Sequence, residues 1–265
     1  MRYERDSDTV CISVSELASY AFQRENPAVL SERYGFVKKT ITSDEDGGDI
    51  VLTSAEHGVI LHSITETDAS LSSAQTEVPL EKRMEYGYFS LSVSGYADII
   101  SPGDGVHTVE EIKTVSSFPR GLSALSYPEH FAQAAVYAYI YVETAALPEV
   151  DVRLSYIKRS NGEKVMFTSR FSLAALTKMF ETLLSRAYVI INAFADRYRV
   201  FSTEADKLPF PYTSVREGQL EFINQAYRVM KKGGSLLVSA PTGIGKTMSA
   251  LFSGVKALGS GTAGR

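Results

Sequence analysis

The stretch from residue 91 to residue 137 constrains the fold of this chain most, because it predicts a tight antiparallel hairpin followed by a helix. The runs LSVSGYADII (91–100) and HTVEEIKTV (107–115) are rich in β-branched residues. The turn signal Pro-Gly-Asp-Gly at 102–105 separates them. We therefore expect two paired strands, with a helix entering after a short loop.

This hairpin brings charged residues together. Paired residue numbers in a hairpin sum to a constant, so Asp98 is expected opposite or beside Glu111. The two-residue period of a strand places Glu111 and Lys113 on one face. In the helix that follows, Gln133 and Tyr137 are four residues apart and share one side. Two carboxylates and one ammonium group should therefore converge on one patch of sheet.

Carboxylates that lie close together repel each other, and a divalent cation removes that repulsion. Hard oxygen ligands suit Mg²⁺ or Mn²⁺. A metal bound by Asp98 and Glu111 would activate a water and offset charge on a phosphate, and Lys113 would add a positive charge there. The alternative is an exposed hairpin with solvated charges, because charged residues make up 22% of the chain. The spacing of the whole set favours the metal site.

These motifs resemble those of the PD-(D/E)XK nucleases, in particular the RecB-like exonuclease branch. The pattern is Gly-x-x-Asp at 95–98, Glu-x-Lys at 111–113 and Gln-x3-Tyr at 133–137. The resemblance implies a restriction-endonuclease-like mixed central sheet flanked by helices. It implies Asp98, Glu111 and the Ile112 carbonyl as metal ligands, Lys113 as the catalytic lysine, and Gln133 and Tyr137 as positioning residues.

One histidine belongs to the same resemblance. His62 follows Gly58 by four residues, in a predicted helix that begins near Ser54. The family's Gly-x3-His element supplies a metal-ligating histidine before the carboxylates. A hydrogen-bonded structural histidine is the alternative for His62. We favour the ligand, and we rank His57 below His62.

Composition limits the classes of function. The net charge is −4, so contact with DNA must come from a local cleft and from metal rather than from overall charge. Cys11 is the single cysteine, which excludes the four-cysteine iron–sulfur cluster that many RecB-like nucleases carry. The N-terminus carries no recognisable signal peptide, and no apolar run approaches the roughly twenty residues of a membrane helix. We expect a cytoplasmic protein with no membrane partner. The oligomeric state stays open.

The remaining elements of the first domain follow from local patterns. We expect about five strands in the sheet, a first helix capped by Ser13 or Ser15, and a bend at Lys82-Arg83 in a strand that starts at Glu77. A further hairpin turns at Asn161-Gly162. A long packing helix capped by Ser172 ends near Tyr198. The predicted boundaries are a nuclease-like domain at 1–200, a linker at 201–215 and a second segment at 216–265.

The second segment carries a phosphate-binding loop. A short apolar strand, SLLVS (235–239), leads into APTGIGKT (240–247), which opens a helix. This segment resembles superfamily 2 helicases, most closely the iron–sulfur group that includes DinG and XPD. The resemblance implies an incomplete P-loop (RecA-like) lobe that binds ATP. The nucleotide-binding residues would be Gln219, which reads adenine, and Thr242, Gly243, Ile244, Gly245, Lys246 and Thr247.

The sequence thus predicts the nuclease module of an ATP-dependent DNA helicase–nuclease, with Mg²⁺ or Mn²⁺ and ATP as cofactors and DNA as partner. The alternative is a helicase whose nuclease-like domain binds DNA without cutting it. Only eighteen residues follow Thr247. We therefore expect a truncated lobe with weak ATP binding and no DNA-stimulated hydrolysis.

Overall fold

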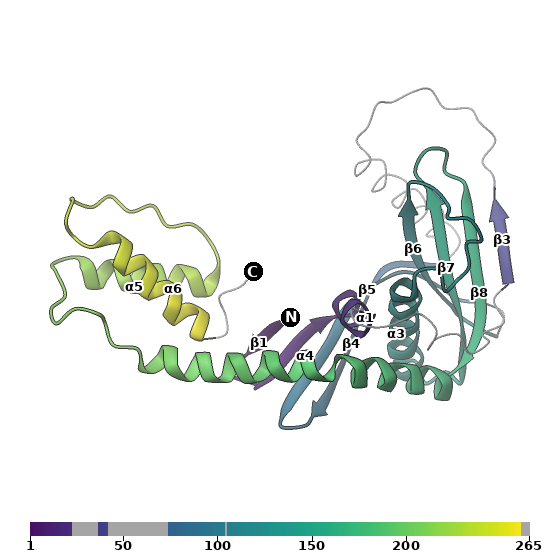
Figure 1. The fold of residues 1–265 in the computed structure, drawn as a ribbon, viewed down its shortest axis with the longest axis horizontal. Helices are drawn as coiled ribbons and strands as arrows, with labels where there is room; N and C mark the ends of the chain where they lie inside the picture. Colours follow the sequence, from purple (N-terminus) through teal and green to yellow (C-terminus); the bar gives the residue numbers. More distant parts are fainter. Residues whose placement is uncertain (23–36, 42–73, 104, 261–265) are drawn as a thin grey trace. The chain divides into compact units, whose positions relative to one another are not determined.

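A computed structural model describes residues 1–22, 37–41, 74–103 and 105–260 (Figure 1). The strands are β1 (Arg2–Glu4), β2 (Thr9–Ser13), β3 (Val37–Ile41), β4 (Gln75–Tyr86), β5 (Phe89–Ser101), β6 (Thr108–Val115), β7 (Glu149–Lys158) and β8 (Lys164–Ser172). The helices are α1 (Val14–Phe22), α3 (Pro128–Thr144), α4 (Leu173–Lys207), α5 (Gln219–Lys232) and α6 (Lys246–Gly259).

The described strands form one mixed sheet. Seven of them follow the order β1-β2-β5-β6-β7-β8-β3, and β4 pairs with β5 outside this path. The α/β class is thereby confirmed, but the sheet has more strands than the five or so expected. The chain divides into two compact units, one of 1–12, 83–92 and 189–265, the other of 13–82 and 93–188.

The central hairpin has the expected register. β5 and β6 are antiparallel, and Ile99 pairs with Glu110. One further step of this register sets Asp98 opposite Glu111, as the sum rule predicted. Both residues therefore reach the same end of the β5–β6 pair.

β6 and β7 are parallel, and the crossover between them contains α3. This helix packs against both strands (Figure 1). Four consecutive residues of β6, from Val109 to Ile112, are buried, which is the pattern of a strand covered on both faces. The β7–β8 hairpin turns at Asn161-Gly162 as predicted, and Gly162 has the positive φ of 67° that this turn needs.

The first helix starts with a capping box, which settles the choice between Ser13 and Ser15. The Glu16 N–H donates to the Ser13 hydroxyl at 3.2 Å, and the Ser13 N–H donates to the Glu16 carboxylate at 3.1 Å. α1 then packs against α3. The predicted cap of the long helix is also present, because the Ala175 N–H donates to the Ser172 hydroxyl at 3.3 Å.

Two elements differ in extent from the prediction. β4 is one continuous strand that starts at Gln75 rather than at Glu77 and runs through Lys82 and Arg83. Exposed and half-buried side chains alternate along β4 except at the buried Leu80, which is the pattern of an outer strand. The long helix ends at Lys207 rather than near Tyr198, so the expected linker at 201–215 begins as helix.

The strand predicted at 235–239 is absent. Residues 233–241 pair with no strand among the described residues, and the Leu237 side chain is fully exposed. An apolar run becomes a central strand only when neighbouring strands cover both edges and both faces. α5 and α6, which flank this stretch in the sequence, pack against each other, and the Ser253 hydroxyl donates to the Ile223 carbonyl at 2.9 Å.

Within the described residues, no helix combines the length and the apolar character needed to cross a membrane.

Candidate functional site

The structure brings together the residues predicted from the Asp, Glu-x-Lys and Gln-x3-Tyr motifs. Asp98 lies on β5, Glu111 and Lys113 on β6, and Gln133 and Tyr137 on α3. The Lys113 ammonium nitrogen lies 2.6 Å from a Glu111 carboxylate oxygen and donates to the Gln133 side-chain oxygen at 3.0 Å. The Glu-x-Lys motif and the Gln-x3-Tyr motif are therefore in direct contact.

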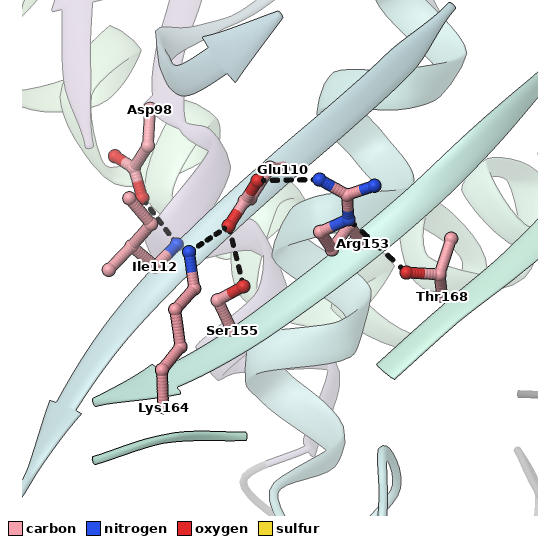
Figure 2. A network of polar contacts seen from close by, with 7 residues as sticks. All are labelled: Asp98, Glu110, Ile112, Arg153, Ser155, Lys164 and Thr168. Atoms are coloured by element: carbon pink, nitrogen blue, oxygen red, sulfur yellow. Dashed lines mark hydrogen bonds and ion pairs between the residues drawn. The ribbon is translucent and has the colours of Figure 1, made fainter. Parts of the chain in front are cut away.

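Asp98 is fixed by the backbone of the neighbouring strand. Its Oδ2 atom accepts the Ile112 N–H at 2.6 Å (Figure 2). The regular β5–β6 pairing extends to Ile99 and Glu110, so this side chain takes over a backbone donor where the pairing ends. Ile112 turns its side chain away from Glu111, into a buried cluster with Ile99 and Ile157.

Tyr137 packs against the glycine of the first motif. A Cβ atom built on Gly95 would lie 2.5 Å from the Tyr137 hydroxyl oxygen and 3.0 Å from its Cε1 atom. Burial raises the pKa of Tyr137 to about 12, and the negative charges of Glu111 and Asp98 act in the same direction. Tyr137 is thus a neutral phenol that faces both carboxylates. Gly95 is required because only a residue without a side chain leaves room for that ring.

The cluster is rich in negative charge. Glu111 is 2% exposed, and Asp98 adds a second carboxylate near one ammonium group. Within the described residues, no three His, Cys, Asp or Glu side chains come together as a metal cluster. Two carboxylates and a strand carbonyl are nevertheless the donor chemistry that Mg²⁺ or Mn²⁺ takes. His62 and His57 lie outside the described residues.

Glu110 forms a second polar network that the sequence analysis missed (Figure 2). Its carboxylate accepts from the Ser155 hydroxyl at 2.6 Å and from the Lys164 ammonium at 2.9 Å, and Arg153 lies 3.2 Å away. Arg153 also donates to Thr168 at 3.2 Å. Burial acts to raise the pKa of Glu110, but Lys164, Ser155 and Arg153 outweigh it, so the pKa is lowered.

Strand alternation puts Glu110 on the opposite face from Glu111 and Lys113. The sequence offers Glu110 and Glu111 as neighbours, and their different roles depend on strand register. Only the pairing of β6 with β7 and of β7 with β8 shows that Ser155 and Lys164 surround the first carboxylate.

The two described histidines, His107 directly before β6 and His130 on α3, have tyrosine hydroxyls as their hydrogen-bond partners. The His107 Nδ1 atom lies 2.5 Å from the Tyr141 hydroxyl. His130 Nδ1 lies 3.2 Å from the Tyr156 hydroxyl, and burial together with the charge of Lys113 lowers the His130 pKa. His130 is therefore a neutral imidazole near Lys113.

The glycine loop at 240–247 leads directly into a helix. Gly243 and Gly245 have φ of 87° and 86°, and α6 begins at Lys246. The Lys246 ammonium donates to the carbonyls of Ala240 at 2.8 Å and Pro241 at 2.9 Å. Its cation therefore lies over the loop's own backbone. Thr242 and Thr247 are exposed on either side of the turn.

Gln219 reaches this loop from the start of α5. A Cβ atom on Gly245 would collide with the Gln219 side-chain amide nitrogen. The Gln219 side-chain oxygen accepts the Arg216 N–H at 3.0 Å, which fixes the amide orientation. Next to it, the Ile244 side chain would lie 3.2 Å from a Cβ atom on Gly218. The structure thus brings Gln219 together with the loop residues.

Comparison with known proteins places the chain in no family. No protein-family model matches it, and no curated protein matches it. One solved structure with some similarity is the crystal structure of SSO0001, which is 20% identical; the match covers 66% of this chain and 75% of that chain with a TM-score of 0.39.

Proposed function

We propose that this chain is the metal-dependent DNA nuclease module of an ATP-dependent helicase–nuclease. The observation that carries this proposal is the convergence of Asp98, Glu111 and Lys113, with Gln133 bound to the lysine. Burying a carboxylate beside a second carboxylate costs folding free energy, and a bound cation would offset that cost. The residues around it supply what phosphodiester hydrolysis needs.

The chain's own residues divide the work. Asp98, Glu111 and the Ile112 carbonyl would hold Mg²⁺ or Mn²⁺, with His62 as a further ligand. The bound cation would supply Lewis-acid activation of water and of a phosphate oxygen. Lys113 stabilises negative charge on the attacked phosphate, and Gln133 orients its ammonium group. Tyr137 holds the Gly95 backbone against the site.

A nuclease assay with linear and circular DNA, single- and double-stranded, tests the proposal. We expect cleavage with Mn²⁺ or Mg²⁺ and none with EDTA. Cleavage of RNA strands with the same sequences shows whether the enzyme distinguishes deoxyribose from ribose.

Asp98→Asn separates a metal ligand from a backbone cap. Asparagine keeps an oxygen that accepts the Ile112 N–H but has no charge to bind a cation. We expect Asp98→Asn to melt like the wild type and to lose cleavage. A folded Asp98→Asn protein with wild-type cleavage would show that Asp98 only caps the strand.

A second candidate function is an ATP-driven helicase whose nuclease-like domain binds DNA without cutting it. The contact of Gln219 with the glycine of the phosphate loop favours a nucleotide site in the second segment. DNA binding without cleavage in any divalent metal, together with ATP binding that Lys246→Ala abolishes, would support this alternative over the first.

A further inference from the structure

A hollow opens at the end of β6. It has a volume of about 290 Å³, just below the roughly 300–1,000 Å³ typical of ligand pockets. We call it the β6-end pocket, and its lining residues are Thr114, Val115, Ser116, Ser117, Pro119, Tyr127, His130 and Arg159.

The lining has the chemistry of an anion site. Three aliphatic hydroxyl groups, the phenol of Tyr127, one imidazole and one guanidinium group line the hollow, and none of its eight lining residues is acidic. Tyr127 and Pro119 add flat apolar walls. Hydroxyls and a guanidinium group are the donors that bind phosphate oxygens in proteins.

Arg159 is the cation of this pocket. Its backbone N–H donates to the Val115 carbonyl at 2.8 Å, which fixes it at the end of the β6–β7 pair. Its Nε atom is buried, and among the described residues it has no hydrogen-bond acceptor. The ion pairs of the described part of the chain leave Arg159 without a carboxylate. A buried N–H of a guanidinium group is satisfied when an anion supplies an oxygen.

The pocket lies close to the candidate site along the chain. Thr114 follows Lys113 directly, and Ser116, the first residue after β6, is three steps of about 3.3 Å from Lys113. On α3, His130 lies one turn before Gln133, which binds Lys113. The charge of Lys113 acts on the His130 ring. A strand bound at Lys113 would therefore pass the pocket within one or two nucleotides.

The start of α3 forms one wall of the pocket. Pro128 has no N–H, and the His130 N–H donates to the Tyr127 carbonyl at 3.0 Å, so the side chains rather than the helix backbone supply the donors here. Tyr127 and His130 both line the pocket, so this helix end borders it.

We propose that the β6-end pocket binds a phosphate group of the nucleic-acid strand next to the cleaved bond, with Arg159 as its principal ligand. This subsite rests on the proposed nuclease function. It sets the position of the strand relative to Lys113, and it requires a substrate that extends beyond the cleaved bond on that side.

The test measures binding of a short fluorescent single-stranded DNA in EDTA, where no cleavage occurs. Arg159→Gln should weaken binding about tenfold and reduce the slope of log affinity against log salt by about 0.7, the value for one phosphate contact on a single strand. The matched control is Arg120→Gln, because Arg120 is exposed in the loop after β6 and does not line the pocket. It should change neither quantity. Melting temperatures of both variants show whether they fold.

A scan with one neutral methylphosphonate linkage at successive positions then locates the contact. The wild type should lose binding at one linkage, and Arg159→Gln should lose nothing further there. Where Arg159→Gln does not fold, Arg159→Lys and Ser117→Ala take its place in the scan.

An equal loss of binding in the wild type and in the Arg159 variant at every linkage overturns the subsite. Wild-type cleavage with unchanged binding by a folded Arg159→Gln protein overturns the subsite alone. A chain that neither binds nor cuts any strand overturns the proposed function, and the subsite with it.

Discussion

The cluster around Asp98, Glu111 and Lys113 and the glycine loop at 240–247 are the two regions for which we propose chemistry on phosphates, and they are held in different ways. The cluster takes side chains from two strands and a helix, and Glu111 is almost completely buried. The loop takes its form from two glycines of positive φ and the start of one helix, and Lys246 is exposed. The geometry of the cluster therefore depends on the surrounding sheet, whereas the geometry of the loop depends on a few backbone angles.

This difference predicts which substitutions should disturb each region. A change anywhere in the strand pairing should disturb the cluster, because its groups come from separate elements. The same change should leave the loop intact. Four predictions probe this contrast.

The largest effect should follow the loss of the lysine charge. We expect Lys113→Ala to lower DNA cleavage by about 10²- to 10³-fold, the usual cost of one electrostatic donor in an active site. ATP binding by the loop should not change. The control is Lys178→Ala, an exposed lysine on α4. Cleavage by a folded Lys113→Ala protein at the wild-type rate would exclude Lys113 from the reaction.

Glu110→Gln should weaken the sheet and spare the loop. Removing this carboxylate leaves Lys164 and Arg153 without their buried partner, a loss of about 3 kcal/mol in the free energy of unfolding. The folded-state pKa of Glu110 is lowered, so its stabilisation is present above the unfolded pKa near 4.5 and is lost as the pH falls below that value. The difference between wild type and variant should therefore shrink on acidification. Urea unfolding at pH 7 and at pH 4 measures it, and an equal difference at both would contradict the network.

Glycine-to-alanine changes should have opposite signs in the two regions. Gly95→Ala forces a Cβ atom against Tyr137, so we expect a loss of about 1–3 kcal/mol. Tyr137→Phe in the same chain should recover part of it, because the nearest clashing atom is the hydroxyl oxygen. Gly254→Ala on α6 meets nothing closer than 4.0 Å and should stabilise by about 0.5–1 kcal/mol. Urea unfolding measures both changes in the free energy of unfolding, and changes of the same sign for Gly95→Ala and Gly254→Ala would contradict this prediction.

The smallest effect concerns the loop lysine. We expect weak ATP binding that Lys246→Ala weakens about tenfold, or about 1.4 kcal/mol. Calorimetric titration with ATP measures this, and cleavage of DNA by the same protein should be unchanged. Phosphate release stimulated by single-stranded DNA and lost in Lys246→Ala would show that the loop is more than a local anion site.

Local sequence determined much of this protein. The β-branched runs and the turn signal at 102–105 were enough for the β5–β6 register, although the connection extends from 102 to 107, because strands joined so closely in the chain have few alternative pairings. Ser13 with Glu16 determined the start of α1, and glycines at 243 and 245 determined the loop. These features depend on residues close together in the chain, so the sequence alone predicts them.

Tertiary structure decided the rest. Glu110 and Glu111 are identical neighbours, and only the pairing of β6 with β7 and β8 separates a charge network from the candidate site. The role of Gly95 appears only when α3 brings Tyr137 against it. The run at 235–239 has the composition of a strand but pairs with none among the described residues, because strand formation needs partners that composition does not supply. Burial and pairing between distant segments, rather than local preference, determined these outcomes.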